Sequence, residues 1–160
     1  MIKEVQGDIL LSGADAVAHG IAPNDNFHQG LALSLRESWP AMYKDFRHYC
    51  HSRHPGPGGL WTWQGAGGVR IINLFTQEGA YDQGSKPGKA RTSWVGHALK
   101  ALRKEINELK VNSIALPRIA TGVGGLDWDD VRPLVEEHLG DLDTTIYLYT
   151  TFRKGVKADE

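Results

Sequence analysis

An apolar stripe between residues 93 and 110 is the clearest pattern along the chain. Val95, Leu99, Leu102, Ile106 and Leu109 recur at intervals of three and four residues. This spacing puts them on one face of a helix, so the segment is predicted to be amphipathic, with its apolar face on the core.

Three further helices are predicted, at 31–39, 40–50 and 128–139. Met42, Phe46 and Tyr49 form an apolar stripe in the second, and Pro40 fits its first turn. Gly140 follows the last helix and is typical of a helix stop.

Short runs of strand-forming residues lie before, between and after these helices. The predicted strands cover 2–5, 14–20, 60–64, 68–75, 111–117 and 144–150. The runs SIALP and TIYLY are apolar enough to be buried on both faces. The order of elements predicts an α/β fold, a three-layer α/β/α sandwich with a mixed central sheet.

The chain is expected to form one domain over 1–153, with a flexible tail at 154–160. It has 160 residues, of which 41% are hydrophobic, enough for a single core. The segment 76–92 has no long apolar run, and loops of this length usually serve as lids or binding segments.

Composition narrows the class of protein. The net charge of −1 indicates no general binding of duplex DNA. Cys50 is the only cysteine, which excludes an internal disulfide and a cysteine-rich zinc site. No run approaches 18 apolar residues and the first residues do not resemble a signal peptide. We therefore expect a cytoplasmic protein with no membrane contact; the oligomeric state stays open.

The stretch PRIATGVGGLDW at 117–128 holds three glycines within four residues, between a predicted strand and a predicted helix. Such a turn can aim several backbone N–H groups at one anion, and the following helix adds its dipole. The alternative is a tight turn with close helix packing. The stretch is neither a Walker loop nor a G-x-G-x-x-G fingerprint.

Two other segments are expected near this turn, because ligands bind at the carboxyl ends of strands in open α/β sheets. Asp8, in GDIL, can accept hydrogen bonds from an exocyclic amine, or it can cap backbone N–H groups of its own turn. The loop at 20–30 joins the second predicted strand to the first helix.

Taken together, these motifs resemble the macrodomain family over about residues 2–152. The resemblance is carried by VQGDIL (5–10), ADAVAH (14–19), NLFT (73–76), PRIATGVGGLDW (117–128) and YLYT (147–150). The branch most similar contains terminal ADP-ribose protein glycohydrolase, the antitoxin of the DNA ADP-ribosylation system and ADP-ribose-1″-phosphate phosphatases.

The resemblance implies a macrodomain fold that binds ADP-ribose at the rim of the sheet, without a metal or other cofactor. Asp8 would bind the adenine amine with Ile9 beside it, and Tyr149 and Phe152 would stack on the base. Gln29 and Gly30 would lie over the distal ribose and one phosphate. The backbone amides around the diphosphate would come from Thr121, Gly122, Val123, Gly124, Gly125 and Leu126.

The residues by which the family's hydrolases act are missing here. The lysine after the threonine of the fourth-strand motif is Gln77, the aspartate of the second glycine-rich loop is Gly124, and the aspartate early in the first helix is Ala32. An amide such as that of Gln77 is neutral and poorly basic, so it is no nucleophile.

Four other side chains are candidates for catalysis. His28 suits general acid–base work, Asp25 and Asp127 suit the orientation of water, and His19 ends a strand below the loop. The alternatives are a hydrogen-bonded strand-end histidine for His19 and a helix N-cap for Asp127. Asp82, Lys86 and Lys89 lie in the long loop and are expected to close over the ligand or to remain solvated.

Three functions are compatible with these features. We favour a hydrolase that removes mono-ADP-ribose from a protein or nucleic acid, or that processes a small ADP-ribose derivative. The missing lysine and aspartates favour a second reading, a non-catalytic ADP-ribose reader module. A sensor of another nucleotide on the same fold is the third.

Overall fold

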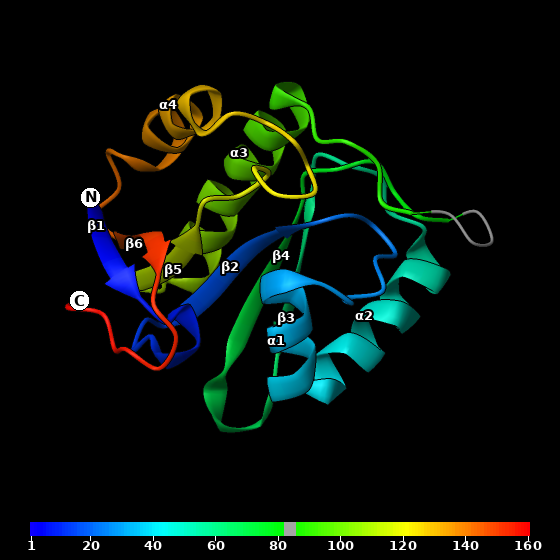
Figure 1. Cartoon of the computed structure of the whole chain (residues 1–160), viewed down its shortest axis with the longest axis horizontal. Helices are drawn as coiled ribbons and strands as arrows, with labels where there is room; N and C mark the ends of the chain where they lie inside the picture. The colour runs from blue at the N-terminus through cyan, green and yellow to red at the C-terminus, as the bar shows by residue number, and fades with distance from the viewer. Residues whose placement is uncertain (82–85) are drawn as a thin grey trace.

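A six-stranded sheet lies between two pairs of helices (Figure 1) in the computed structural model, which describes residues 1–81 and 86–160. The strands are β1 Ile2–Gly7, β2 Ala16–Ile21, β3 Leu60–Gln64, β4 Arg70–Phe75, β5 Ser113–Pro117 and β6 Thr145–Phe152. The helices are α1 Gly30–Ser38, α2 Pro40–Arg53, α3 Thr92–Leu109 and α4 Trp128–Leu139. The predicted three-layer α/β fold is confirmed.

The strand order is β1-β6-β5-β2-β4-β3. All neighbours pair in parallel except β3, which is antiparallel to β4 at one edge. The sheet is therefore mixed, as the sequence predicts. Because the other five strands run the same way, their carboxyl ends meet at one edge of the sheet, which is where the loops of interest begin.

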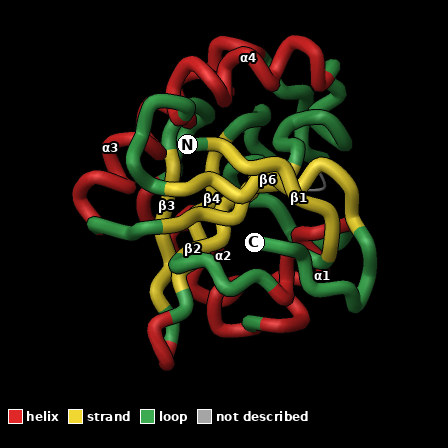
Figure 2. The backbone as a smooth tube through the Cα atoms, turned by 90° about the vertical axis from the view of Figure 1, so that its left-hand side faces the viewer, coloured by secondary structure: helices red, strands yellow, loops and turns green. Residues whose placement is uncertain are grey.

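Helices lie on both faces of the sheet (Figure 2). Each face buries its own apolar cluster. On one face, α3 packs with Val95, Leu99, Leu102 and Ile106, all fully or almost fully buried, and α4 packs beside it. On the other face, α1 and α2 cover β2, β3 and β4 with an aromatic cluster centred on Phe46. The helix α3 thus buries the predicted stripe, with Leu109 at its end only partly buried.

The helix α2 differs from its prediction at the C-terminal end. It continues to Arg53, and its buried stripe is Met42, Phe46 and Cys50, while Tyr49 is only half-buried. Tyr49 instead stacks on Trp61 of β3 with ring centroids 5.3 Å apart. A spacing of four places residues 42, 46 and 50 on the same face. The predicted helix contains Cys50, but the predicted stripe ended on Tyr49 and was wrong at that position.

The sequence predicts a flexible tail at 154–160, and in the structure these residues pack against the start of the chain. Ala158 is 8% exposed and belongs to a small apolar cluster with Val5, Ile9 and Tyr149. A short 3-10 helix at Ile9–Leu11, which the sequence pattern does not indicate, lies beside this segment.

Over the described residues, no helix is long and apolar enough to cross a membrane.

Replacement of Phe46 by alanine tests the aromatic cluster. The side chain is fully buried and its ring lies 4.8 Å from that of Phe27 and 6.1 Å from that of Phe75. We expect the free energy of unfolding in urea to fall by about 3–5 kcal/mol, because the change leaves a cavity. Lys44→Ala on the exposed face of α2 is the control. A similar loss of unfolding free energy in that variant would contradict the assignment of Phe46 to the core.

Candidate functional site

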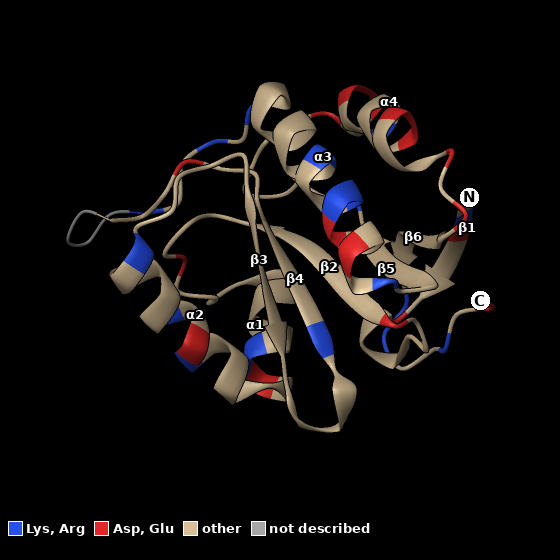
Figure 3. Ribbon diagram, turned by 180° about the vertical axis from the view of Figure 1, so that it is seen from behind, with Lys and Arg blue, Asp and Glu red and all other residues tan. Residues whose placement is uncertain are grey.

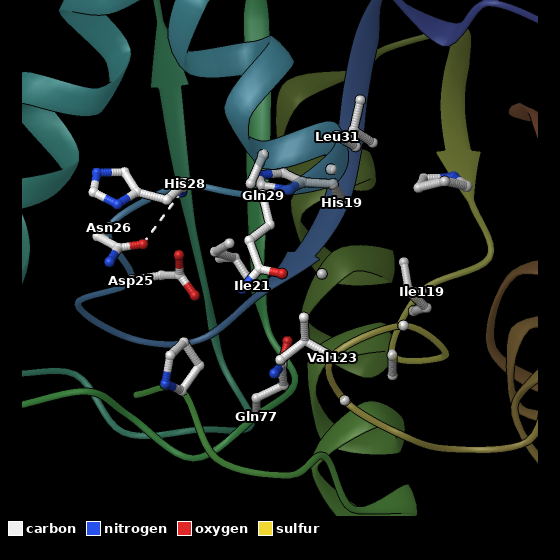
Figure 4. A pocket seen from close by; sticks show the side chains of 18 of the residues that line it. His19, Ile21, Asp25, Asn26, His28, Gln29, Leu31, Gln77, Ile119 and Val123 are labelled. Carbon is white, nitrogen blue, oxygen red and sulfur yellow. Dashed lines mark hydrogen bonds between the residues drawn. The ribbon is translucent and has the colours of Figure 1, made fainter. Parts of the chain in front are cut away.

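A cleft runs along the edge of the sheet where the parallel strands end. Its polar compartment has a volume of about 620 Å³. The walls come from the end of β2, the loop that leads to α1, Gln77 after β4, and the segment after β5. Figure 4 shows the side chains of these walls directed around one central space. The loops predicted to share a rim do lie together.

The segment after β5 presents unpaired backbone amides to this space. Within the described parts of the chain, no group accepts a hydrogen bond from the amides of residues 121–124. The amides of Gly125 and Leu126 are different, because they donate to the carbonyls of Gly122 and Ala120, 3.0 Å away in each case. Four consecutive amides are therefore available for an anion, while the next two close the turn.

Each glycine in this loop has its own reason. A Cβ on Gly122 would point into open space, whereas one on Gly124 would lie 2.7 Å from the carbonyl oxygen of Ala120. Gly125 has a φ of +77°, which disfavours side chains. Only Gly122 thus matches the expectation of a position cleared for a ligand, and the other two fit the alternative of a tight turn.

The N-terminus of α1 faces the same compartment. Gly30, Leu31 and Ala32 line it, and the first amides of a helix have no partner within the helix. Gln29 occupies the N-cap without a capping hydrogen bond from its side chain. The helix dipole adds to these donors, so an anion between the loop and the helix would face donors from both.

An apolar compartment of about 390 Å³ continues the cleft beyond Gly30, Leu31 and Pro117, which line both spaces. Ile9, Tyr149 and Phe152 are among its walls. Phe152 is 65% exposed at the mouth, whereas Tyr149 is 5% exposed and its hydroxyl donates to Glu160. Phe152 is therefore the more accessible of the predicted stacking aromatics.

Asp8 is held by its own turn. One carboxylate oxygen accepts a hydrogen bond from the Leu10 amide and the other accepts one from the Gly155 amide, both at 3.0 Å. The neighbours Gly7, Ile9 and Leu10 line the apolar compartment, and Asp8 is 7% exposed. The capping alternative is realised, and Asp8 itself is not among the residues that line either compartment.

Asp25 is the buried carboxylate of the polar compartment. It is 8% exposed, lines the cleft, and accepts a hydrogen bond from the Phe27 amide at 2.7 Å through Oδ1. Burial raises the pKa of this carboxyl, against the opposing effects of the Phe27 amide and of His28. A desolvated acid with one oxygen left for other partners is typical of a functional group.

His19 lies at the floor of the cleft but is tied into the sheet. Its Nε2 is 2.7 Å from Oδ1 of Asn73, whose own amide donates to the Trp61 carbonyl. Burial lowers the pKa of His19 to about 4, so it is neutral near pH 7. The strand-end reading of His19 agrees with this geometry better than acid–base work does.

The remaining catalytic candidates lie farther from the centre. His28 lines the cleft, but it is exposed and its ring is turned outward in Figure 4, where Asp25 and Gln29 point inward. Asp127 lies outside both compartments and accepts a hydrogen bond from the Asp129 amide at 2.9 Å, as the N-cap of α4. The N-cap reading of Asp127 therefore describes its place.

At positions where the family's hydrolases carry catalytic residues, this chain has residues that only contribute to the structure. The Gln77 amide donates to the Gly88 carbonyl at 3.0 Å and fastens the long loop across the cleft. Lys86 of this loop lines the cleft, and Lys89 lies beside Gly125. Ala32 contributes only a methyl group to the wall, and Asp82 lies outside the described residues.

Comparison with known proteins identifies the fold. The model of the Macro domain matches residues 68–135. The solved macrodomain of Thermus aquaticus DarG superposes with a TM-score of 0.81 at 26% identity, over 94% of this chain and 98% of that one. The chain has the macrodomain fold.

Two more relatives add detail. A DNA ADP-ribosyl glycohydrolase of Mycobacterium tuberculosis is 29% identical over 153 residues, which are 92% of this macrodomain. The match spans only 42% of that relative, about two-fifths of its length. A Thermosipho africanus DarTG, solved in complex with ADP-ribose, has a TM-score of 0.80 at 17% identity and covers 98% of this chain and 42% of its own.

Sequence reasoning missed two features of the macrodomain cleft. Ala120 adopts a left-handed φ of +64° although it is not glycine, which turns the chain into the loop. The fully buried Thr76 hydroxyl has no hydrogen-bond partner among the described residues. Neither feature has a signal in the local sequence, because both depend on contacts between distant segments.

Gly122→Glu tests the anion site of this macrodomain. The carboxylate would extend into the space that Gly122 leaves open and repel a diphosphate, so we expect affinity for ADP-ribose to fall by about two orders of magnitude. Isothermal calorimetry measures this loss. Gly122→Ala adds one uncharged carbon to the same space and should lose much less affinity than the Glu variant; undiminished binding by the Glu variant would refute the assignment of the loop.

Proposed function

We propose that this macrodomain binds ADP-ribose and hydrolyses the bond between its distal ribose and a macromolecule. One observation carries the proposal: a single cleft joins an apolar compartment, a wall of free amides and a buried carboxylate. ADP-ribose carries an apolar base, then a diphosphate, then a ribose, and this order matches the three parts of the cleft. The similarity to enzymes named DNA ADP-ribosyl glycohydrolases supports it.

The ligand would lie along the cleft in one direction. Adenine fits the apolar compartment, against Tyr149 and Phe152. The diphosphate then lies between the amides of 121–124 and the start of α1, where donors face it from both sides. The distal ribose reaches the part of the cleft that Asp25 and Gln77 line.

Asp25 supplies the chemistry in this proposal. A water molecule attacks the anomeric carbon of the distal ribose as the bond to the macromolecule breaks. The Asp25 carboxylate accepts the proton of that water and passes it to the leaving group, so that charge and atoms balance. Because burial raises the pKa of Asp25, its ionised form is more basic than an exposed aspartate.

ADP-ribosylated DNA is the substrate that we favour. The curated relatives carry a name that specifies DNA. Acidic and basic side chains are mixed over α2 and α3 (Figure 3), and the net charge is −1. Recognition would therefore rest on the modified nucleotide and not on the general charge of a duplex.

A reader without turnover is the second candidate. Gln77 is engaged with Gly88, and positions 32 and 124 carry no ionisable side chain. ADP-ribosylated DNA, mono-ADP-ribosylated protein and ADP-ribose-1″-phosphate should be assayed side by side for release of ADP-ribose or phosphate. Release from any of them supports a hydrolase; ADP-ribose binding with no turnover of any supports the reader.

Asp25→Asn separates binding from chemistry. The amide keeps an oxygen for the Phe27 N–H but cannot accept a proton, so we expect kcat to fall about 10²–10⁴-fold with the affinity for ADP-ribose retained. Full activity of this variant would exclude Asp25 as the catalytic base. Single-turnover assays and calorimetry on the same preparation give both quantities.

The pH dependence follows from the raised pKa of Asp25. The active form is the carboxylate, so activity should fall as the pH drops through a value above the usual aspartate range near 4. The stability of the fold depends on pH in the opposite direction. Because the pKa of Asp25 is raised in the folded state, this group contributes stability below its unfolded-state pKa, and that contribution is lost as the pH rises through its folded-state pKa. Asp25→Asn should therefore have an equal or higher Tm at pH 7.

His28→Ala is expected to retain binding and to reduce turnover. The positive charge of His28 lowers the pKa of Asp25, so its removal should move the acidic limb of the activity profile to higher pH. Rates measured between pH 4 and pH 9 on wild type and variant would reveal the shift. A profile that coincides with wild type at every pH would remove His28 from the mechanism.

A further inference from the structure

Two arginines contact the loop that carries Asp25. Nη1 of Arg36, in α1, donates to the Asn26 carbonyl at 2.8 Å. Nη1 of Arg47, in α2, donates to the side-chain oxygen of Asn24 at 3.1 Å. Asp25 stands between these two residues in the chain, and Figure 4 shows it beside Asn26 in the wall of the polar compartment. Two guanidinium groups therefore lie against the part of the cleft wall that holds the buried carboxylate.

Both guanidinium groups keep donors for a further partner. Among the described residues, each donates only through Nη1, and neither forms an ion pair with a carboxylate. Arg36 and Arg47 are half-buried, so part of each side chain meets solvent. A guanidinium group has five N–H donors in a fixed plane, an arrangement that suits the oxygens of a phosphate. The contacts with the loop use one side of each group and leave the other side available.

The surface around these arginines is basic and includes an aromatic ring. The Arg36 guanidinium lies 4.0 Å from the centre of the Tyr43 ring, and Tyr43 precedes Arg47 by about one turn of α2. Together, α1 and α2 carry four lysine and arginine residues against two acidic ones, Glu37 and Asp45. These helices are therefore positively charged, although the net charge of the whole chain is −1.

We propose that Arg36 and Arg47 bind backbone phosphates of the DNA strand that carries the ADP-ribosylated base. The inference rests on the proposed function, which places the bond between the distal ribose and the macromolecule beside Asp25. The strand then begins next to the loop at 24–26, where the two arginines lie. A nucleic acid has an anion at every nucleotide, so its chemistry matches a pair of guanidinium groups with unused donors.

These contacts supplement the cleft and do not replace it. Each phosphate contact with a single strand releases counterions, so the slope of log K against log salt becomes steeper by about 0.7 per contact. Two contacts alone would bind an unmodified strand only weakly, in keeping with the net charge of −1. Their effect is to favour ADP-ribose on DNA over free ADP-ribose and over ADP-ribose on a peptide.

Binding of two ligands tests the inference: free ADP-ribose, and a single-stranded oligonucleotide with one ADP-ribosylated base. Arg36→Gln and Arg47→Gln are each made in the Asp25→Asn background, so that the oligonucleotide is not consumed. For each, we expect the affinity for the oligonucleotide to fall about three- to tenfold and its salt slope to shrink by about 0.7, because one phosphate contact is lost. The affinity for ADP-ribose should not change. With Asp25 present, kcat/KM for the oligonucleotide should fall by the same factor.

The control is Lys100→Gln, which removes the same charge from an exposed position on α3, on the other face of the sheet. An equal loss for both ligands would reduce the arginines to supports of the loop and overturn the proposal. The proposal would also fail if the oligonucleotide affinity and salt slope stayed unchanged, or if Lys100→Gln lost as much. A mono-ADP-ribosylated peptide gives a third measurement, and a loss equal to that of the oligonucleotide would contradict a phosphate contact.

Melting curves establish that the variants fold, and either folded arginine variant decides the matter. The arginine-containing chain decides it otherwise: its salt slope for the oligonucleotide should exceed that for ADP-ribose by about 1.4, the value for two contacts. Equal slopes for the two ligands would overturn the proposal. Failure of this chain to bind ADP-ribose at all would instead overturn the proposed function, and this inference with it.

Discussion

Backbone N–H groups without a partner are the constraint on which the site depends. A buried amide without a partner costs free energy comparable to a lost hydrogen bond. Consecutive unpaired amides therefore occur only where water or an anion reaches them. The parallel strands meet this condition by ending at one edge, where β5 leads into the loop at 120–127 and β2 leads toward α1. Left-handed conformations at Ala120 and Gly125 then keep the amides of 121–124 from closing into a helix.

The periodic parts of the fold were predictable because their signal is local. The stripe from Val95 to Leu109 determines its helix and the face it buries, and the apolar runs around residues 71–75 and 114–116 determine buried strands. The site was only partly predictable, because residues of the same type have different roles there. Gly122 and Gly124 look alike in the sequence, and only the carbonyl of Ala120 beside the second distinguishes them.

The catalytic candidates show the same limit. Asp25 and His28 lie three residues apart in one polar loop, and nothing in their order says which faces inward. The direction is set by Phe27, which is fully buried at a left-handed φ of +55° and packs on Phe46. The Phe27 amide then binds Asp25, so a core aromatic turns the carboxylate into the cleft and leaves His28 outside. The segment after β6 escaped prediction for a related reason, since most of its contacts use main-chain atoms.

Burial of Asp25 links the stability of the fold to its chemistry. Desolvation works against the ionised form, which lowers stability at neutral pH, and the protein offsets only part of this with one amide and a nearby histidine. A second donor on Oδ2 would stabilise the carboxylate and lower its basicity, so the incomplete pairing favours proton transfer over stability. Asp8, with a backbone donor on each oxygen, is the opposite case: a carboxylate in the same domain whose orientation is fixed on both sides. The two aspartates thus differ in how many backbone amides bind them, one for Asp25 and two for Asp8, and the carboxylate with fewer donors is the more basic of two otherwise equal groups.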